Sequence, residues 1–501
     1  MCSRMADPAG IDIARDADER DDLPVVDHPA DISPAPPTTD RRVRLASAGF
    51  MFTLVCAGVV LRFWSLGTHR LNFDESFTAM AARRPLGDLF RFLAHHDSHP
   101  PLDFLLRAPL ARAGASEFLF RLPSVLCSCA ALAVFAWWVR RRGIAGAVAV
   151  GLMAGGAFQL ARGREARMYA EMELLGVVAA VLTYAWLRRA RSWHSPLMGV
   201  LVLAGSMTHV SMLLLGAGLL TVPGVRRDRE AWRWRASLVG GVVAWAAIWG
   251  PSFMVQARGG HSSWIGPTTF SRLEDALGRL VTYRSGFFVP VLLAVGLGAL
   301  VLRRCDPTLA RVWTCAFAVP VAVGAVAGTI APVVLDRTFT VVAWAPLLAI
   351  GYLVARVVRL SRPIGIVAIV AIAGITVPSA LSSYSLRTGP DVALRELERR
   401  AAPGDVVAVN SSKAVELQWS LGVRGRLPAR PVTLHDLPAT NALLLGPGPP
   451  TGRIWLLDQH RSAVYALARC APTWASGDSR VLCLARATRD PEPRRVAVSA
   501  R

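Results

Sequence analysis

Lysine is nearly absent from this chain of 501 residues: Lys413 is the only one, and arginine carries the rest of the positive charge. We attribute this bias to coding composition rather than to function. Charged residues of either sign are also scarce at 18%, whereas hydrophobic residues make up 53%. A soluble protein of this length would carry more charge, so the composition excludes that class and predicts a polytopic α-helical membrane protein.

Cysteine motifs are missing as well: the eight cysteines include no CxxC pair and no metal-ligand spacing. This pattern argues against a zinc-binding domain. Cys470 and Cys483 would be able to form a disulfide if the C-terminal part of the chain is exported. Four other cysteines lie in apolar segments, where we expect small core residues: Cys56, Cys127, Cys129 and Cys315.

The formal net charge of +21 would point to nucleic acid in a soluble protein. Here the arginines gather in short clusters between apolar segments, as they do in cytoplasmic membrane loops. We therefore expect membrane lipids, and no nucleic acid, as partners. The N-terminus is polar and acidic and the first apolar segment starts late, so we expect no cleavable signal peptide.

The arginine clusters also orient the chain in the plasma membrane. Residues 1–40 predict a disordered cytoplasmic tail, because they are rich in Asp, Pro and Ala. Residues 41–384 then hold about eleven transmembrane helices, with the N-terminus cytoplasmic and the C-terminal domain extracytoplasmic. The stretch 196–225 is read as two short helices that turn near His209. The other expected spans are 45–66, 122–139, 144–161, one ending at 187, 236–255, 287–302, 312–335, 339–355 and 364–381.

The composition changes after residue 384, where a small extracytoplasmic α/β domain is expected to extend to residue 490. Its predicted helix is 391–400. The predicted strands are 405–409, 442–445, 454–457 and 481–484. Residues 491–501 predict a second disordered tail.

Polar residues gather on the predicted outer face of the membrane part. The first outer loop holds the acidic pair Asp74-Glu75, and a segment with three histidines and a Pro-Pro pair follows at 95–102. Acidic and imidazole groups at a lipid–water boundary suit a reaction on a lipid-borne substrate; the alternative is an ordinary polar loop. Apolar residues at helical spacing predict amphipathic surface helices at 85–94 and 101–110. The candidate site residues are Asp74, Glu75, Asp97, His99, Glu165, Arg167, Tyr169, His209 and Arg337.

Two of these residues, Arg167 and Arg337, oppose the usual bias that keeps arginine on the cytoplasmic side. Each therefore needs a specific anionic partner. A lipid phosphate would serve, and so would a protein carboxylate such as Glu165 or Asp336. For His209, a satisfied buried histidine and a functional role are both open.

The motifs resemble those of the GT-C membrane glycosyltransferases, in particular glycosyltransferase family 39, which includes protein O-mannosyltransferases and aminoarabinose transferases. The resemblance covers about residues 43–381 and rests on six short pieces of sequence. They are Asp74-Glu75, Asp97-x-His99-Pro100-Pro101-Leu102, Glu165-Ala166-Arg167-x-Tyr169, Thr208-His209, Trp264-Ile265-x-Pro267 and Arg337.

The resemblance implies a GT-C fold and a polyprenyl-phosphate-linked sugar, mannose or similar, transferred with inversion to an acceptor hydroxyl outside the membrane. In that scheme Asp74 is the general base, and Glu75 orients the acceptor or the base. Arg167 and Arg337 hold the donor phosphate. Glu165 fixes Arg167, whereas Asp97, His99, Tyr169 and His209 line the site. The acceptor would be a glycan, a lipid or a protein.

The chain departs from the family in two ways. Lysine, which some relatives place near the lipid phosphate, is missing from the whole membrane part, and no C-terminal repeat of the eukaryotic mannosyltransferases is visible. We expect no cofactor: a divalent metal is compatible with the family, but the spacing of His95, His96, Asp97 and His99 does not indicate one. Two alternatives remain, namely a GT-C enzyme that ligates or polymerises a lipid-linked glycan, and a transporter or flippase.

Overall fold

The computed structural model describes most of the membrane part and parts of the C-terminal domain. The described residues are 41–222, 229–259, 265–282, 288–331, 334–385, 397, 399–410, 418–419, 429–432, 440–445, 453–458, 475–476 and 479–486. The two predicted tails, Cys470 and most of the predicted helix 391–400 lie outside this set.

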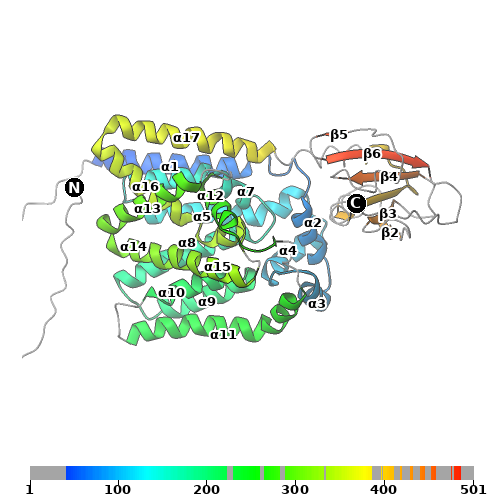
Figure 1. Ribbon diagram of the computed structural model, residues 1–501, viewed down its shortest axis with the longest axis horizontal. Helices are drawn as coiled ribbons and strands as arrows, with labels where there is room; N and C mark the ends of the chain where they lie inside the picture. The colour runs from blue at the N-terminus through cyan, green and yellow to red at the C-terminus, as the bar shows by residue number, and fades with distance from the viewer. Residues whose placement is uncertain are drawn as a thin grey trace, which may run out of the picture.

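Helices form one large body in the described part of the chain (Figure 1). They are α1 (Arg41–Phe63), α2 (Phe73–Ala82), α3 (Leu86–His96), α4 (Leu102–Arg112), α5 (Glu117–Val139), α6 (Ile144–Gly155), α7 (Ala157–Gly163), α8 (Tyr169–Arg188), α9 (His194–Thr208), α10 (Met212–Leu219), α11 (Arg229–Arg258), α12 (Phe270–Thr282), α13 (Phe288–Cys305), α14 (Pro307–Trp313), η3 (Thr314–Ala318), α15 (Val319–Ile330), η4 (Asp336–Val342), α16 (Trp344–Leu360) and α17 (Arg362–Ser385).

Among the described residues, six helices are long and apolar enough to cross a membrane, and up to eight if each of two bent pairs is one span. Large apolar side chains on several of them face outward, such as Ile364, Ile366 and Val367 of α17. The chain is therefore a helical membrane protein. The count of eleven spans and the orientation of the two ends stay predictions.

Two predicted spans are bent in the structure. The span expected at 144–161 divides into α6 and α7, which meet at 49°, and η4 meets α16 at 67°. Arg62 of α1 is fully buried at the first break, where its guanidinium donates to the carbonyls of Met153 (2.9 Å) and Ala154 (3.1 Å) at the end of α6. It also donates to the hydroxyl of Ser128 in α5 (2.8 Å). A helix end exposes unpaired carbonyls, so the arginine completes the hydrogen bonds that the bend removes.

Helices are confirmed at the two predicted positions, as α3 and α4, whereas their place on the membrane surface stays a prediction; the loop before them contains a further helix, α2. In Figure 1 these three helices lie at one end of the bundle, between the spans and the strands. α12 was not predicted; it lies between the expected spans 236–255 and 287–302. The predicted turn near His209 is confirmed: α9 ends at Thr208 and α10 begins at Met212.

The described strands of the C-terminal domain form one mixed sheet with the order β2-β3-β1-β4-β6-β5. β1 (Val406–Asn410) pairs parallel with β4 (Arg453–Asp458) and antiparallel with β3 (Thr440–Leu445), and β6 (Ser479–Arg486) pairs antiparallel with β4. These four strands were predicted. The short strands β2 (Ala429–Val432) and β5 (Ala475–Ser476) were not.

Candidate active site

The N-terminal turn of α2 sets the position of the acidic pair. Asn72 caps the helix: its side chain accepts the N–H of Glu75 (2.9 Å), and the Glu75 carboxylate accepts the N–H of Asn72 (2.9 Å). This reciprocal capping box fixes the first turn. Adjacent residues on a helix point about 100° apart, so Asp74 and Glu75 face different surroundings.

Glu75 is fully buried behind the site. Arg121 of α5 donates hydrogen bonds to both carboxylate oxygens of Glu75, to Oε1 at 2.8 Å and to Oε2 at 2.7 Å. The N–H of Ala166 also donates to Oε1, at 2.8 Å. With Asn72 as a further donor, the carboxylate is saturated with hydrogen bonds. Glu75 therefore ties α2 to α5 and to the 165–167 segment and does not face the substrate side.

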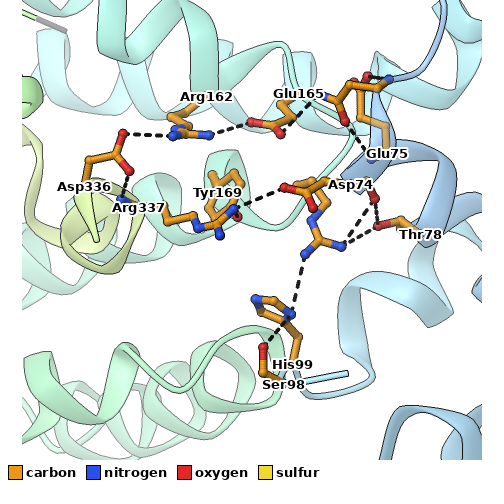
Figure 2. Close-up of polar contacts among 12 residues, drawn as sticks. Asp74, Glu75, Thr78, Ser98, His99, Arg162, Glu165, Tyr169, Asp336 and Arg337 are labelled. Carbon is orange, nitrogen blue, oxygen red and sulfur yellow. Dashed lines mark hydrogen bonds and ion pairs between the residues drawn. The ribbon is translucent and has the colours of Figure 1, made fainter. Parts of the chain in front are cut away.

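Asp74 is the accessible member of the pair, with its side chain 32% exposed. Its Oδ2 accepts a hydrogen bond from Nη1 of Arg337 at 3.1 Å, and the same Nη1 donates to the hydroxyl of Tyr169 at 3.3 Å (Figure 2). Arg337 lies in the first turn of η4 and Tyr169 at the start of α8. Three elements far apart in sequence thus meet at one carboxylate.

Arg167 lies beside this carboxylate and is 3% exposed. Its Nη1 donates to the hydroxyl of Thr78 at 2.8 Å and approaches the backbone carbonyl of Asp74 at 3.5 Å. Within the described residues, no carboxylate lies within 4.0 Å of this guanidinium, and its buried Nε has no hydrogen-bond partner. Burial opposes the charge, but the nearby Asp74, Tyr169 and Asp97 raise the pKa of Arg167 above its ordinary value, so the side chain stays cationic.

Glu165 does not fix Arg167, contrary to the prediction from the resemblance. Its carboxylate instead pairs with Arg162 at 2.9 Å, and Arg162 also pairs with Asp336 at 2.8 Å (Figure 2). The two carboxylates considered as partners for the outer arginines are thus both bound by a third arginine. Arg162 lies in the last turn of α7 and Glu165 follows that helix three residues later, so their closeness in the sequence was the signal that could have shown the pair.

Asp97 and His99 form a second polar pair at the end of α3. Oδ1 of Asp97 accepts hydrogen bonds from Nδ1 of His99 (2.8 Å) and from the N–H of Ser98 (2.7 Å). Burial raises the pKa of Asp97, but His99 and Arg167 together lower it below its ordinary value. The ring of His99 lies 5.2 Å from that of His209. The structure thus brings together seven predicted residues, which are linked by these contacts: Asp74, Asp97, His99, Arg167, Tyr169, His209 and Arg337.

A buried network of ion pairs and hydrogen bonds, which was not predicted, contacts the backbone of Arg167. Arg107 of α4 pairs with Asp103 at 2.7 Å and with Glu171 at 2.8 Å, and its Nη2 also donates to Ser124. The Ser124 hydroxyl donates to the backbone carbonyl of Arg167 at 3.1 Å. The i, i+4 spacing of Asp103 and Arg107 was the only signal in the sequence.

The described residues contain no group of three or more His, Cys, Asp or Glu side chains placed to hold a metal ion. His95 and His96 are exposed, whereas Asp97 and His99 are turned inward as a pair. The expectation of no cofactor stays a prediction. Trp264, part of one motif of the resemblance, lies outside the described residues.

No protein-family model matches the chain, and no curated protein matches it. Two solved structures are similar to it at low sequence identity. The apo structure of ArnT from Cupriavidus metallidurans shares 17% of its residues, with a TM-score of 0.46 and 75% of each chain covered. The structure of that protein bound to undecaprenyl phosphate gives 17% identity and a TM-score of 0.47, again over 75% of each chain. Similarity at this level assigns neither a function nor a substrate to the chain.

Proposed function

We propose that this chain is a GT-C-type membrane glycosyltransferase that transfers a sugar from a polyprenyl-phosphate donor to an acceptor hydroxyl at the outer face of the plasma membrane. The observation that carries the proposal is Arg167. It is a buried cation whose Nε lacks an acceptor, and within the described residues it has no carboxylate partner. A buried charge without a partner is strongly unfavourable, so the site is built for an anionic ligand.

A phosphate group fits this position. Guanidinium groups bind phosphate oxygens through paired, charge-assisted hydrogen bonds. Arg167 and Arg337 both border Asp74, through contacts to its backbone carbonyl and its carboxylate respectively. A donor phosphate on the two arginines would leave its sugar within reach of the carboxylate. Arg162 is committed to two carboxylates and would act only as a support.

In the proposed reaction, the oxygen of the acceptor hydroxyl bonds to the anomeric carbon of the sugar while Asp74 takes the hydroxyl proton. The bond from that carbon to the phosphate oxygen breaks, and its electron pair stays on the oxygen. Polyprenyl phosphate leaves with one more negative charge than it had as the sugar ester. Arg167 and Arg337 stabilise that charge as it develops.

The first test compares membranes that contain the parent, Asp74→Asn or Asp88→Asn. Each is supplied with radiolabelled polyprenyl-phosphate sugars, and release of polyprenyl phosphate is followed with label in the acceptor fraction. We expect turnover of one donor by the parent, loss of at least 100-fold in Asp74→Asn, and no change in Asp88→Asn. Asp88 is the matched control because it is an exposed acid on α3. Equal turnover in parent and Asp74→Asn would remove Asp74 as the base, and no turnover with any donor or acceptor would overturn the proposal.

The second test concerns the phosphate subsite alone. Arg167→Met should weaken binding of polyprenyl phosphate at least tenfold, because a charge-assisted hydrogen bond contributes about 1.5–3 kcal/mol. The substitution leaves no carboxylate behind, so the melting temperature should stay near that of the parent. Arg91→Met, at an exposed position on α3, is the control. Unchanged binding would show that Arg167 does not contact the phosphate.

A further inference from the structure

Two histidines in the site have no part in the proposed proton transfer. His99 follows α3 and His209 lies in the turn between α9 and α10, so neither belongs to a span. Their rings lie 5.2 Å apart at an angle of 43°, and both are half-buried. No protein group within the described residues binds Nε2 of either ring, whereas Nδ1 is engaged in both.

The hydrogen bonds of His209 determine which nitrogen carries its proton. The backbone N–H of Ser211 donates to Nδ1 at 3.0 Å, so Nδ1 must present a lone pair. The proton of the neutral ring is then on Nε2. Burial, His99 and the two arginines lower the pKa of His209 well below its ordinary value, so the ring is neutral at neutral pH. Nε2 of His209 is therefore a hydrogen-bond donor.

His99 has the opposite arrangement. Its Nδ1 lies 2.8 Å from a carboxylate oxygen of Asp97, and a carboxylate can only accept, so Nδ1 carries a proton. Nε2 of His99 is then an acceptor in the neutral ring and a donor in the protonated ring. The chain holds this loop in place through Gln256 of α11, whose side chain donates to the carbonyls of Leu93 (3.0 Å) and His99 (3.4 Å).

The charge around the two rings excludes a cationic ligand group. The Nη2 atom of Arg167 lies 3.5 Å from His99, and Arg337 is close enough to lower the pKa of His209. The nearest carboxylate, Asp97, already accepts from His99 and Ser98 through Oδ1, and its Oδ2 is sealed from solvent. An ammonium group placed here would meet two arginines and a ring N–H, and the two nearby carboxylates are already engaged, Asp97 by His99 and Asp74 by Arg337.

We propose that His99 and His209 recognise neutral hydroxyl groups of the transferred sugar, so that the donor carries a neutral sugar rather than an amino sugar. This inference rests on the proposed function. A hydroxyl both donates and accepts, so it can accept from Nε2 of His209 and can bond to Nε2 of His99 in either protonation state of that ring. The sugar is bonded to the phosphate that Arg167 would hold, and Arg167 reaches toward His99 on the side opposite its contact with Thr78. The hydroxyls that do not react are thus the groups that can meet the two rings.

The test measures kcat/KM with matched donors that differ by one group: a hydroxyl, a hydrogen or an ammonium at the same carbon. The kcat/KM of the parent should be at least tenfold higher with the hydroxyl donor than with either of the others. The deoxy donor leaves a ring nitrogen without a hydrogen-bond partner, and the ammonium donor leaves a charge without a counter-charge. In His209→Phe, kcat/KM should fall about tenfold with the hydroxyl donor. With the deoxy donor, kcat/KM should be the same in His209→Phe and in the parent. His209→Gln, which can keep a donor near Nε2, should recover part of the loss.

His194→Phe is the matched control. His194 lies at the other end of α9, and its Nδ1 also accepts a backbone N–H, from Arg191 at 3.3 Å. Competition by polyprenyl phosphate without sugar should be equal in the parent, in His209→Phe and in His194→Phe. A preference for the ammonium donor, or equal loss of competition and of turnover in His209→Phe, would overturn the assignment and leave the proposed function standing. Absence of turnover by the parent with every donor and acceptor would overturn both.

Discussion

Asp74 and Glu75 are neighbours in the sequence but differ completely in surroundings. The sequence was sufficient to select the pair and to place it on the same face as Arg167 and Arg337. It was not sufficient to separate their roles, because the side chain that buries Glu75 is Arg121, 46 residues later. Pairwise contacts at that distance leave no local pattern. For the same reason the pairing of Glu165 with Arg162 was assigned to the wrong arginine.

Arg121→Met should destabilise the protein by about 3–5 kcal/mol, because it leaves the fully buried Glu75 without its counter-charge. Arg121 also donates to the carbonyls of Leu66, His69 and Arg70, which would lose those bonds. Thermal unfolding in detergent measures the effect. Adding Glu75→Gln should restore part of the stability; a double variant less stable than the single one would contradict this account.

Asp97 should make stability depend on pH in the acid range. Its pKa is lower in the folded protein than the ordinary value of 3.8, so the ionised form stabilises the fold above that value. This contribution is lost as the pH falls through the lower folded pKa. Melting temperatures of the parent and of Asp97→Asn should therefore differ most near neutral pH and converge below about pH 4. If the difference in melting temperature between the parent and Asp97→Asn stayed constant down to pH 3, the charge of the Asp97 carboxylate would not contribute to stability.

At the scale of helices, hydropathy predicted most of the long helices to within a few residues but did not predict where they bend. Hydropathy stays apolar across both breaks, and their marks are instead the pair Gly155-Gly156 at the first and Pro346 in the first turn after the second. The bends matter because they bring Arg162 in α7 and Asp336 in η4 to one ion pair. α12 had a visible signal, since Leu273, Leu277, Leu280 and Val281 recur at helical spacing.

Gly176 controls how closely α8 approaches η4. A methyl group added there would lie 1.8 Å from the carbonyl oxygen of Val341, which is impossible without moving a helix. Gly176→Ala should therefore cost about 1–3 kcal/mol or more and should weaken donor binding, because α8 carries Tyr169 and η4 carries Arg337. Melting temperature and polyprenyl-phosphate binding test this.

Gly296→Ala is the control for that substitution. Gly296 lies in α13, and an added methyl group would meet no atom within 4 Å. It should not destabilise the protein: no new contact forms, and the higher helix propensity of alanine should add up to about 1 kcal/mol of stability. Equal effects of the two substitutions would mean that glycine acts only through helix propensity.

For the whole molecule, the sequence predicted four strands of the C-terminal domain but not how that domain meets the helices. Trp419 is 1% exposed, and its ring lies 5.8 Å from that of Phe120 in α5. It packs in a cluster with small residues of α2 and α4 and with Ala166, directly behind the site. The small alanine side chains of this cluster leave space for an indole ring, but only the folded structure shows that Trp419 is the tryptophan that packs there.

Trp419→Ala should loosen the C-terminal domain from the membrane part. Truncation of a buried aromatic side chain costs about 3–5 kcal/mol. We expect faster cleavage by protease near residue 388 and lower turnover, with Trp232→Ala unaffected because Trp232 is 70% exposed on α11. Cleavage at the parental rate would mean that other contacts hold the domain.

The arginine that caps the broken span also bears on how the chain is made. Arg62 belongs to α1, and its described partners lie on α1 itself, α5 and α6, so most of them are synthesised after it. Arg62 is in the last turn of α1, and an arginine near the end of a lone helix can extend its side chain to the interface. α1 is thus synthesised before most of the groups that hydrogen-bond to its arginine. The buried surroundings of Arg62 are complete only once α6 has been made.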